Sequence, residues 1–219
     1  MICINDITMR YGKNIALSNV NCKLVQGEVP GLLGANGAGK TTLLRIVAGL
    51  IDNFDGNVNF SQSHCKIGYL PEQRGLFADQ QVGEQLVFFA QLNGLKKKNA
   101  VENVVYWLDK LEASEWKNKK ISQLSKGMAQ KIQFIASVVH DPELLLLDEP
   151  MSGLDPLHSM RIREIISSLS QQGKTIVLST HNLDDAARLC NKYVILRQGK
   201  VTFEGGIMGI TEQQILSML

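Results

Sequence analysis

The sequence lacks the charge imbalance that marks many nucleic-acid-binding proteins. Its 23 Lys and Arg residues nearly balance its 21 Asp and Glu residues, which leaves a formal net charge of +2. A surface that neutralises phosphates needs concentrated Lys and Arg, so we expect no nucleic-acid partner. One basic run, Lys96-Lys97-Lys98, is expected to be a solvated helix end or loop, although a membrane surface could also attract it.

Paired cysteines and long apolar runs are also missing. The four cysteines are scattered, with none of the short spacings that ligate zinc, so we expect reduced thiols. No apolar run approaches the roughly 18 residues that a membrane-spanning helix needs, and no secretory signal pattern opens the chain. These absences predict a soluble, cytoplasmic protein.

What the chain does have is enough apolar material for a core. It contains 219 residues, of which 44% are hydrophobic, and neither an internal repeat nor a low-complexity linker interrupts it. We predict one domain over residues 1–219. Its core comprises 1–72 and 126–219, and an inserted helical part occupies about 73–125.

The first part of the chain alternates apolar and polar residues, which predicts an antiparallel β layer. Strands are expected at about 2–9, 20–24, 58–60 and 66–70, with turns at 11–14 and 52–56.

Helical periodicity follows from Val82 to about Leu111. The residues expected on apolar faces there are Val82, Leu86, Phe89, Val101, Val104, Val105 and Leu108. Trp107 and Trp116 are expected to pack in the same part.

Beyond Gly127, helices and strands alternate. The run Leu144–Leu147 has no polar alternation, which is typical of a parallel strand buried on both faces. The other expected elements are helices at 128–139, 157–170 and 183–189, a strand at 175–179 and a hairpin around 198–199. This order predicts an α/β protein.

One motif dominates the chain: Gly34-Ala35-Asn36-Gly37-Ala38-Gly39-Lys40-Thr41-Thr42. It lies between an expected strand, Val29–Leu33, and an expected helix. Its glycines let bare N–H groups face phosphates, Lys40 reaches the β and γ oxygens, and Thr41 offers a hydroxyl to Mg²⁺. The motif therefore predicts a nucleotide site with bound Mg²⁺.

Pro30 is unusual within that strand, because proline lacks an N–H and is disfavoured in central strands. We expect it either to be the first residue of the strand or to delay the start of the ladder.

Two acids follow the buried run at Leu144–Leu147. Asp148 is placed to hold Mg²⁺ together with Thr41, and Glu149 to polarise a water for in-line attack on the γ-phosphate. A merely polar strand end would explain the pair alone, but the phosphate loop favours the catalytic interpretation.

These motifs and five others occur in one order over nearly the whole chain. Besides the phosphate loop and the two acids, there are five such elements: Tyr11, Gln73, the segment Leu124-Ser125-Lys126-Gly127-Met128, the segment Ser152-Gly153-Leu154-Asp155, and Ser179-Thr180-His181. In this order they resemble the ATP-binding cassette of ABC transporters. The resemblance implies an α/β P-loop NTPase of the ABC-ATPase fold, with an antiparallel β subdomain and an inserted α-helical subdomain. The Ser-Lys-Gly-Met form resembles the ABC-2 type, exporter-like branch.

The resemblance also implies roles for three single residues. Tyr11 would stack on adenine, unless it is a simple turn aromatic. Gln73 would sense Mg²⁺ and the γ-phosphate as a catalytic and metal-binding residue, and His181 would position the attacking water. The remaining histidines, at 64, 140 and 158, match no family position.

A second anion site is expected where Ser125, Lys126 and Gly127 open a helix. Since the phosphate loop already binds this chain's own ATP, the second site makes sense if it caps the ATP of another copy, with Asp155 acting across the interface. This implies a head-to-tail dimer, homomeric or heteromeric. Ordinary helix caps would explain Ser125 and Asp155 locally, and for Asp155 both roles could hold.

The sequence thus predicts an ATPase subunit that drives a separate membrane permease, for export, from the cytoplasmic face of the membrane. The alternative is a soluble ABC-type ATPase that acts on DNA or ribosomes. Neither the long coiled coil typical of chromosomal ATPases nor the second cassette usual in ribosome-associated ones is present. A phosphate-loop kinase or a non-hydrolysing switch conflicts with Glu149 and His181 occurring together with the signature segment.

Overall fold

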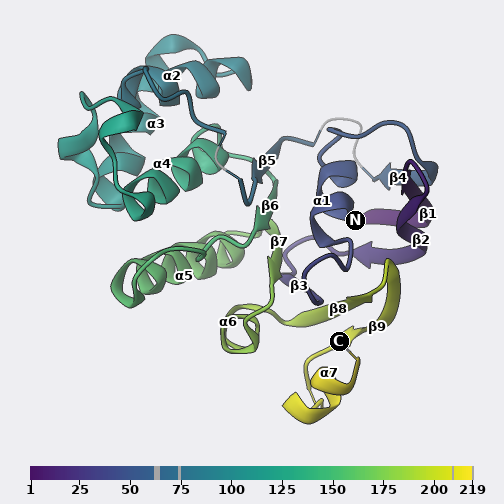
Figure 1. The fold of residues 1–219 in the computed structure, drawn as a ribbon. Coiled ribbons are helices and arrows are strands. Elements are labelled where there is room, and N and C mark those ends of the chain that lie inside the picture. Colours follow the sequence, from purple (N-terminus) through teal and green to yellow (C-terminus); the bar gives the residue numbers. More distant parts are fainter. Residues whose placement is uncertain (62–64, 74, 209, 219) are drawn as a thin grey trace.

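The computed structural model describes residues 1–61, 65–73, 75–208 and 210–218 and contains two sheets (Figure 1). The smaller has the strand order β2-β1-β4, and the larger has the order β5-β6-β7-β3-β8-β9. Helices pack around the larger sheet, so the predicted α/β class with an antiparallel β layer is confirmed.

The smaller sheet consists of β1 (Ile2–Tyr11), β2 (Asn14–Leu24) and β4 (Asp55–Phe60), all paired antiparallel. The expected turn at 52–56 was too long, because Asp55 and Gly56 already belong to β4. Asp55 pairs with Thr8, so the ladder begins before the alternating apolar residues do. Gly56 has φ 95°, a backbone conformation that glycine tolerates.

The larger sheet is parallel except at one edge. Its strands are β3 (Pro30–Leu33), β5 (Ile67–Leu70), β6 (Leu144–Asp148), β7 (Thr175–Thr180), β8 (Lys192–Arg197) and β9 (Lys200–Gly206). Only β9 runs antiparallel, to β8, through the expected hairpin at 198–199. Pro30 is the first residue of β3, where a missing N–H interrupts the ladder least.

Seven α-helices and two short 3-10 helices, Ser114–Trp116 and Ile121–Gln123, are described in these ranges. The α-helices are α1 (Lys40–Val47), α2 (Val82–Leu92), α3 (Lys97–Lys110), α4 (Lys126–Val138), α5 (Pro156–Gln171), α6 (Leu183–Leu189) and α7 (Glu212–Met218). Helices α2, α3 and α4 gather at one side of the molecule, away from the sheet of β1, β2 and β4 (Figure 1). The domain boundaries at 72 and 126 stay a prediction.

Helix α3 corrects one expectation about apolar faces. Val101 and Val105 are 39% and 47% exposed, although they were expected to be buried. The helix buries Ala100, Val104, Trp107 and Leu108 instead. Each exposed valine directly follows a buried residue, and one step along a helix turns the side chain by about 100°. The buried positions of Trp107 and Trp116 are confirmed, each at 7% exposure.

The sheet separates two apolar cores, and β6 shows how. Leu145 and Leu147 belong to the core shared with the helical part, whereas Leu144 and Leu146 belong to the core shared with α1 and the small sheet. Successive side chains of a strand point to opposite faces, so an unbroken leucine run fills both cores. This confirms the buried parallel strand that ends at Asp148.

Two absences hold within the described residues. The cysteines at 3, 22, 65 and 190 are all free thiols. None of the helices there combines the length and the apolar character required to cross a bilayer.

Candidate active site

The phosphate loop lies at the carboxyl end of β3, between Leu33 and the start of α1 at Lys40. Gly39 caps α1 with φ 105°, and Gly37 has φ 82°. A Cβ atom at Gly34 would lie 2.5 Å from the Leu196 carbonyl oxygen, so this position has no room for a side chain. The backbone therefore wraps around the positive end of α1, the usual place for an anion.

Lys40 is held inside this loop. Its side chain is buried, and Nζ donates hydrogen bonds to the carbonyl oxygens of Gly34 at 2.7 Å and Ala35 at 3.2 Å. The ammonium group is thus already positioned where phosphate oxygens would arrive.

A pocket of about 510 Å³ opens over the loop. It is lined by Tyr11, Ala16, residues 36–42, Glu72, Asp148 and Glu149. The structure therefore brings Tyr11, the phosphate loop and both acids together. Of the residues predicted to bind this chain's own ATP and Mg²⁺ or to act on that ATP, Gly34, Ala35, Gln73 and His181 are not among its lining.

Asp148 ends β6 deep in the molecule, at 1% exposure. Its Oδ1 accepts a hydrogen bond from the Ser179 hydroxyl, while its Oδ2 is buried without a partner among the described residues. Asp148 lines the same pocket as Thr41, and a buried, unpaired carboxylate oxygen suits a hard cation such as Mg²⁺, which prefers oxygen ligands.

Glu149 directly follows and has an unusual backbone conformation, with φ 50°. Its N–H donates to both the carbonyl and the hydroxyl oxygen of Ser179, each at 3.2 Å. Its Oε1 accepts a hydrogen bond from His181 Nδ1 at 2.8 Å. A left-handed glutamate is rare, and such strain is concentrated at functional sites. The backbone turn at Glu149 thus sets the direction of the carboxylate, and the hydrogen bond from His181 holds it in place.

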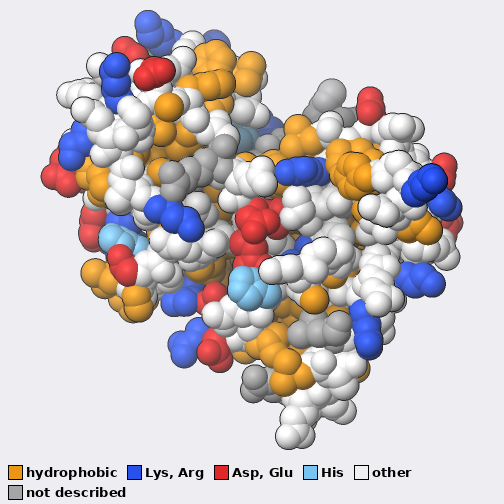
Figure 2. All heavy atoms as spheres, viewed as in Figure 1, with side chains coloured by type: hydrophobic (Ala, Val, Ile, Leu, Met, Phe, Trp, Pro, Cys, Tyr) orange, Lys and Arg blue, Asp and Glu red, His pale blue; other side chains and the backbone are white. Residues whose placement is uncertain are grey.

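The strand register explains why these groups meet. In the parallel pair β6–β7, Asp148 lies opposite Ser179, so the residues that follow leave the sheet side by side. His181 comes directly after β7, and its side chain is 66% exposed. In the view of Figure 2, acidic and histidine side chains gather near the centre of this face, below the notch beside the helical part.

Gln73 has an exposed side chain outside the pocket, whereas its neighbour Glu72 lines the pocket. The sequence did not predict Glu72 as a site residue. Glu72 belongs to no motif, and its only signal is that it directly precedes Gln73. Nor did the sequence predict Gln133 on α4, whose Nε2 donates to the carbonyl oxygens of Pro71 at 2.7 Å and Gln73 at 3.3 Å. Gln133 thereby anchors the segment that carries both residues.

The predicted second anion site lies apart from this pocket. Ser125 caps α4, where its Oγ accepts from the Met128 N–H at 3.2 Å. Lys126 and Gly127 begin the helix, and the Lys126 side chain lies against Gly153: a Cβ there would stand 2.8 Å from Lys126 Cε. No member of this group lines the pocket over the phosphate loop, as far as the chain is described. A role toward another copy stays a prediction.

Asp155 caps α5 by accepting from the His158 N–H at 3.0 Å, and its other oxygen contacts His158 Nδ1 at 2.5 Å. The backbone N–H and then the ring of His158 lower the pKa of this carboxyl below its ordinary value. The cap predicted as an alternative role is therefore present, and His158 is a partner that the sequence reading did not assign. His140 is buried against Ile67, and His64 lies outside the described residues.

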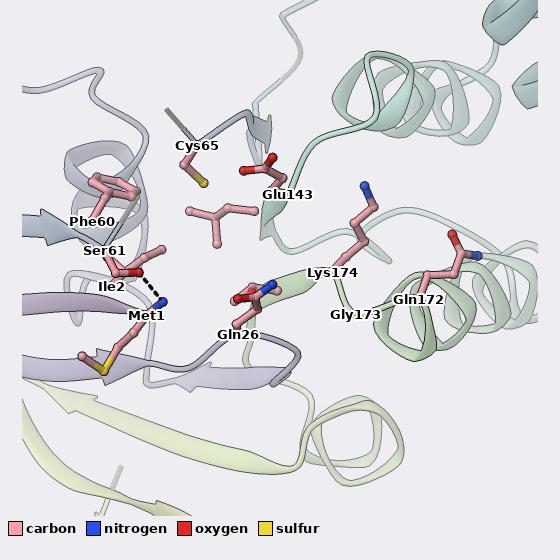
Figure 3. Close-up of a pocket in the computed structure, with 12 residues that line it drawn as sticks. Met1, Ile2, Gln26, Phe60, Ser61, Cys65, Glu143, Gln172, Gly173 and Lys174 are labelled. Atoms are coloured by element: carbon pink, nitrogen blue, oxygen red, sulfur yellow. Dashed lines mark hydrogen bonds between the residues drawn. The ribbon is translucent and has the colours of Figure 1, made fainter. Parts of the chain in front are cut away.

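A second hollow, of about 250 Å³, lies at the opposite ends of the same strands (Figure 3). Glu143 and Lys174, just before β6 and β7, line it together with Met1 and Cys65. The side chain of Lys174 points away from its centre (Figure 3). Ligands of open α/β sheets bind at the carboxyl ends of the strands, where the phosphate loop lies.

Comparison with known proteins agrees with this geometry. A family profile described as "ABC transporter" matches residues 17–152. An uncharacterised ABC transporter ATP-binding protein of Methanocaldococcus jannaschii is 46% identical over 95% of this chain and 79% of its own length. Nod factor export ATP-binding protein I of Burkholderia orbicola is 30% identical over 98% of this chain and 73% of its own. The dimeric structure of a bacterial ABC transporter cassette superposes with a TM-score of 0.86 at 25% identity, covering 96% of this chain and 100% of that one.

Proposed function

Because this chain belongs to the ABC transporter family of ATP-binding cassettes, we propose that it binds ATP with Mg²⁺ over the phosphate loop and hydrolyses it to drive a separate membrane permease. One observation carries the hydrolytic part. The carboxylate of Glu149, aimed by its turn and held by His181, lines the same pocket as Asp148, Lys40 and Thr41.

In this proposal the loop residues 34–42 surround the phosphates, and Lys40 exchanges its carbonyl partners for β and γ oxygens. Thr41 and Asp148 would hold Mg²⁺, which would neutralise charge on those oxygens, and Gln73 is the third proposed ligand. Tyr11, which is 48% exposed at the pocket rim, stacks on adenine.

Glu149 acts as the general base. His181 Nδ1 donates a hydrogen bond to Oε1, so the second carboxylate oxygen is the one that takes a proton from the water that attacks the γ-phosphate. In return, Glu149 fixes the orientation of the imidazole, whose other nitrogen can then face the γ-phosphate. Each residue therefore positions the other.

Ser125, Lys126, Gly127 and Asp155 act on a second cassette. The amino end of α4 with its serine cap would close over the γ-phosphate bound to the partner copy, in a head-to-tail dimer. Dimeric assembly of a similar cassette supports this arrangement. The sequence leaves open whether the two copies are identical.

The permease is the proposed partner, and the cytoplasmic face of the membrane is the proposed location. Export is the proposed direction, supported by the Ser-Lys-Gly-Met signature and by the similarity to a Nod factor export protein. The transported substrate would be selected by the permease.

The Glu149→Gln variant tests the catalytic assignment. The amide keeps the shape but cannot accept the proton, so we expect ATP turnover to fall by about 10² to 10⁴-fold while ATP binding persists in a closed dimer. Steady-state phosphate release and size-exclusion chromatography with ATP measure the two effects. Glu102→Gln, on the exposed side of α3, is the matched control and should hydrolyse ATP like the parent. Parental turnover in Glu149→Gln would exclude this residue as the base.

A further inference from the structure

The connection between α2 and α3 carries exposed side chains that the proposed ATPase does not use. Helix α2 ends at Leu92 and α3 begins at Lys97, so only residues 93–96 join them. The three lysines at 96–98 are all exposed, and the described lining of the pocket over the phosphate loop includes none of them. In Figure 2, hydrophobic and basic side chains both lie along the upper edge of the helical part.

Hydrogen bonds fix the shape of this connection. The Leu95 N–H donates to the Ala90 carbonyl oxygen at 3.1 Å. The Gly94 N–H, in a residue with φ 90°, donates to the Gln91 carbonyl oxygen at 2.9 Å. The two bonds form a Schellman motif, which closes the carboxyl end of a helix. The fold therefore holds the end of α2 and the start of α3 close together.

The three lysines stand at the end of a helix that least favours positive charge. Lys96 is the N-cap of α3 and makes no capping hydrogen bond with its side chain, and the first turn, which contains Lys97 and Lys98, has no acid. The amino end of a helix carries a partial positive charge, which repels cations. None of the three lysines forms an ion pair in the described part of the chain. Their charges therefore lower the stability of α3 and are free to attract an external anion.

Exposed apolar side chains adjoin these charges. Leu92 is 71% exposed, and Phe88, one turn earlier on the same face of α2, is 50% exposed. The acid on that face is Glu84, in the first turn of α2, about 12 Å from Leu92 along the helix axis. Residues 85–101 contain the three lysines and no Asp or Glu. The end of α2 and the start of α3 thus combine positive charge with apolar surface.

This combination matches the surface of an anionic bilayer. Negative headgroups attract lysines, and the boundary between headgroups and acyl chains accepts apolar side chains. We propose that the α2–α3 tip, which consists of Phe88, Leu92 and the lysines at 96–98, binds the anionic surface of a lipid bilayer. The inference goes beyond the proposed function and does not depend on it, because it concerns only this chain and lipid.

A nucleic acid fits the tip less well than a bilayer does. Its phosphates would attract the lysines, but Leu92 and Phe88 would gain no apolar environment from them. A net charge of +2 also provides no broad basic surface on which a duplex could lie. The apolar side chains therefore distinguish lipid from other polyanions.

Sedimentation of the full chain with lipid vesicles tests the proposal. One set of vesicles is phosphatidylcholine, and the other contains equal parts of phosphatidylcholine and phosphatidylglycerol. We expect the parent to bind only the anionic set, and less tightly as salt is added. Replacing the three lysines at 96–98 by glutamine should weaken binding about fivefold for each lysine, or about a hundredfold in all.

Two further variants separate the tip from general effects. The matched control replaces Lys23, Lys66 and Lys200 by glutamine, which removes the same charge from exposed positions outside the helical part, and it should bind anionic vesicles much like the parent. Leu92→Gln keeps every charge and should weaken binding about tenfold, because it removes the apolar contact.

Thermal unfolding shows whether the lysines serve the fold instead. Since their removal relieves repulsion at the amino end of α3, the variant without lysines at 96–98 should unfold at a Tm no lower than that of the parent. A lower Tm would reveal partners within the chain and would overturn the inference.

Three binding results would also overturn it: equal affinity of the two triple variants for anionic vesicles, parental affinity in Leu92→Gln, or tighter binding of the parent to a DNA duplex than to the vesicles. Each of these results leaves the proposed function standing, because ATP turnover in Glu149→Gln tests that function separately.

Discussion

Glu149 shows how a single residue can be held in a conformation that its own sterics disfavour. A φ of 50° costs a residue with a Cβ roughly 1 to 3 kcal/mol. The surroundings offset this cost, since Ser179 accepts its N–H twice and His181 binds its carboxylate. The turn takes Glu149 out of the line of β6, and the residue lines the pocket over the phosphate loop, where the proposed general base is needed.

His140 makes stability depend on pH. Burial lowers its pKa in the folded chain below the ordinary value of 6.5. As the pH falls below that value, the unfolded chain binds a proton that the folded chain excludes, so the free energy of unfolding decreases until the folded pKa is reached. Urea titrations at several pH values between about 5 and 8, the range in which histidine side chains change charge, measure how the free energy of unfolding depends on pH.

The matched variant for this prediction is His140→Gln, which cannot titrate but keeps a donor for the Ile67 carbonyl oxygen. Its free energy of unfolding should depend less on pH than that of the parent. The two proteins differ only at position 140, so equal slopes would contradict the assignment.

For single residues, the motifs predicted which ones share the pocket but did not predict all of their contacts. Lys40, Asp148 and Glu149 were predicted to meet because their residue types and order fit one reaction, and the structure brings them together. The contacts made by Gln133 and Glu72 were not predicted. They depend on how α4 packs against the segment 71–73, and no local pattern encodes that packing.

Among the elements, the turn from β3 into α1 depends on two glycines for different reasons. A Cβ at Gly34 would meet the backbone of Leu196 in β8, which cannot move without moving a strand. At Gly37 a Cβ would have open space, and the only cost is its φ of 82°. One position is limited by packing and the other by backbone conformation.

We therefore expect Gly34→Ala to lower the free energy of unfolding by about 1 to 3 kcal/mol, and occasionally more, as overpacking does. Gly37→Ala should cost about 1 kcal/mol from backbone strain alone. Urea unfolding at fixed pH compares the two variants with the parent. A larger loss for Gly37→Ala would show that β8 yields easily to the added methyl group.

The type of an element was predictable where one hydrophobic period dominated a long segment. The first and last residues of the elements were less predictable. The leucine run of β6 and the alternation of β1 were unambiguous. The early start of β4 was not, because Asp55 and Gly56 are typical turn residues that pairing with β1 draws into a strand. The valines at 101 and 105 were wrongly expected to be buried, because only the packing of α3 decides which of its faces is buried.

The arrangement of the whole molecule separates the two halves of the proposed ATP site. Within the described residues, Ser125, Lys126 and Gly127 at the start of α4 do not line the pocket over the phosphate loop, which lies at the carboxyl end of β3. Under the proposed function, a complete site needs two copies, each supplying one half.

Mixing two defective subunits tests this arrangement. A Ser125→Arg subunit keeps its phosphate loop but should not cap a partner, and a Lys40→Ala subunit keeps its cap but should not bind ATP. Alone, each should form no closed dimer with ATP. The mixture should recover one of the two composite sites, measured as ATP-dependent dimer and residual phosphate release. A mixture that recovers neither the ATP-dependent dimer nor phosphate release would argue against the head-to-tail assembly.

The pairing of Asp148 with Ser179 also bears on how faithfully the protein folds. Because side chains alternate along a strand, a slip of β6 against β7 by one residue would turn the leucine run over and still leave leucines on both faces. Only one acid, Glu143 or Asp148, would then take a position that a leucine now holds. Such a chain could stay compact while its acids and His181 no longer met. The fraction of a preparation that binds ATP therefore counts the molecules with correct strand pairing, which is a measure of folding quality that compactness alone does not give.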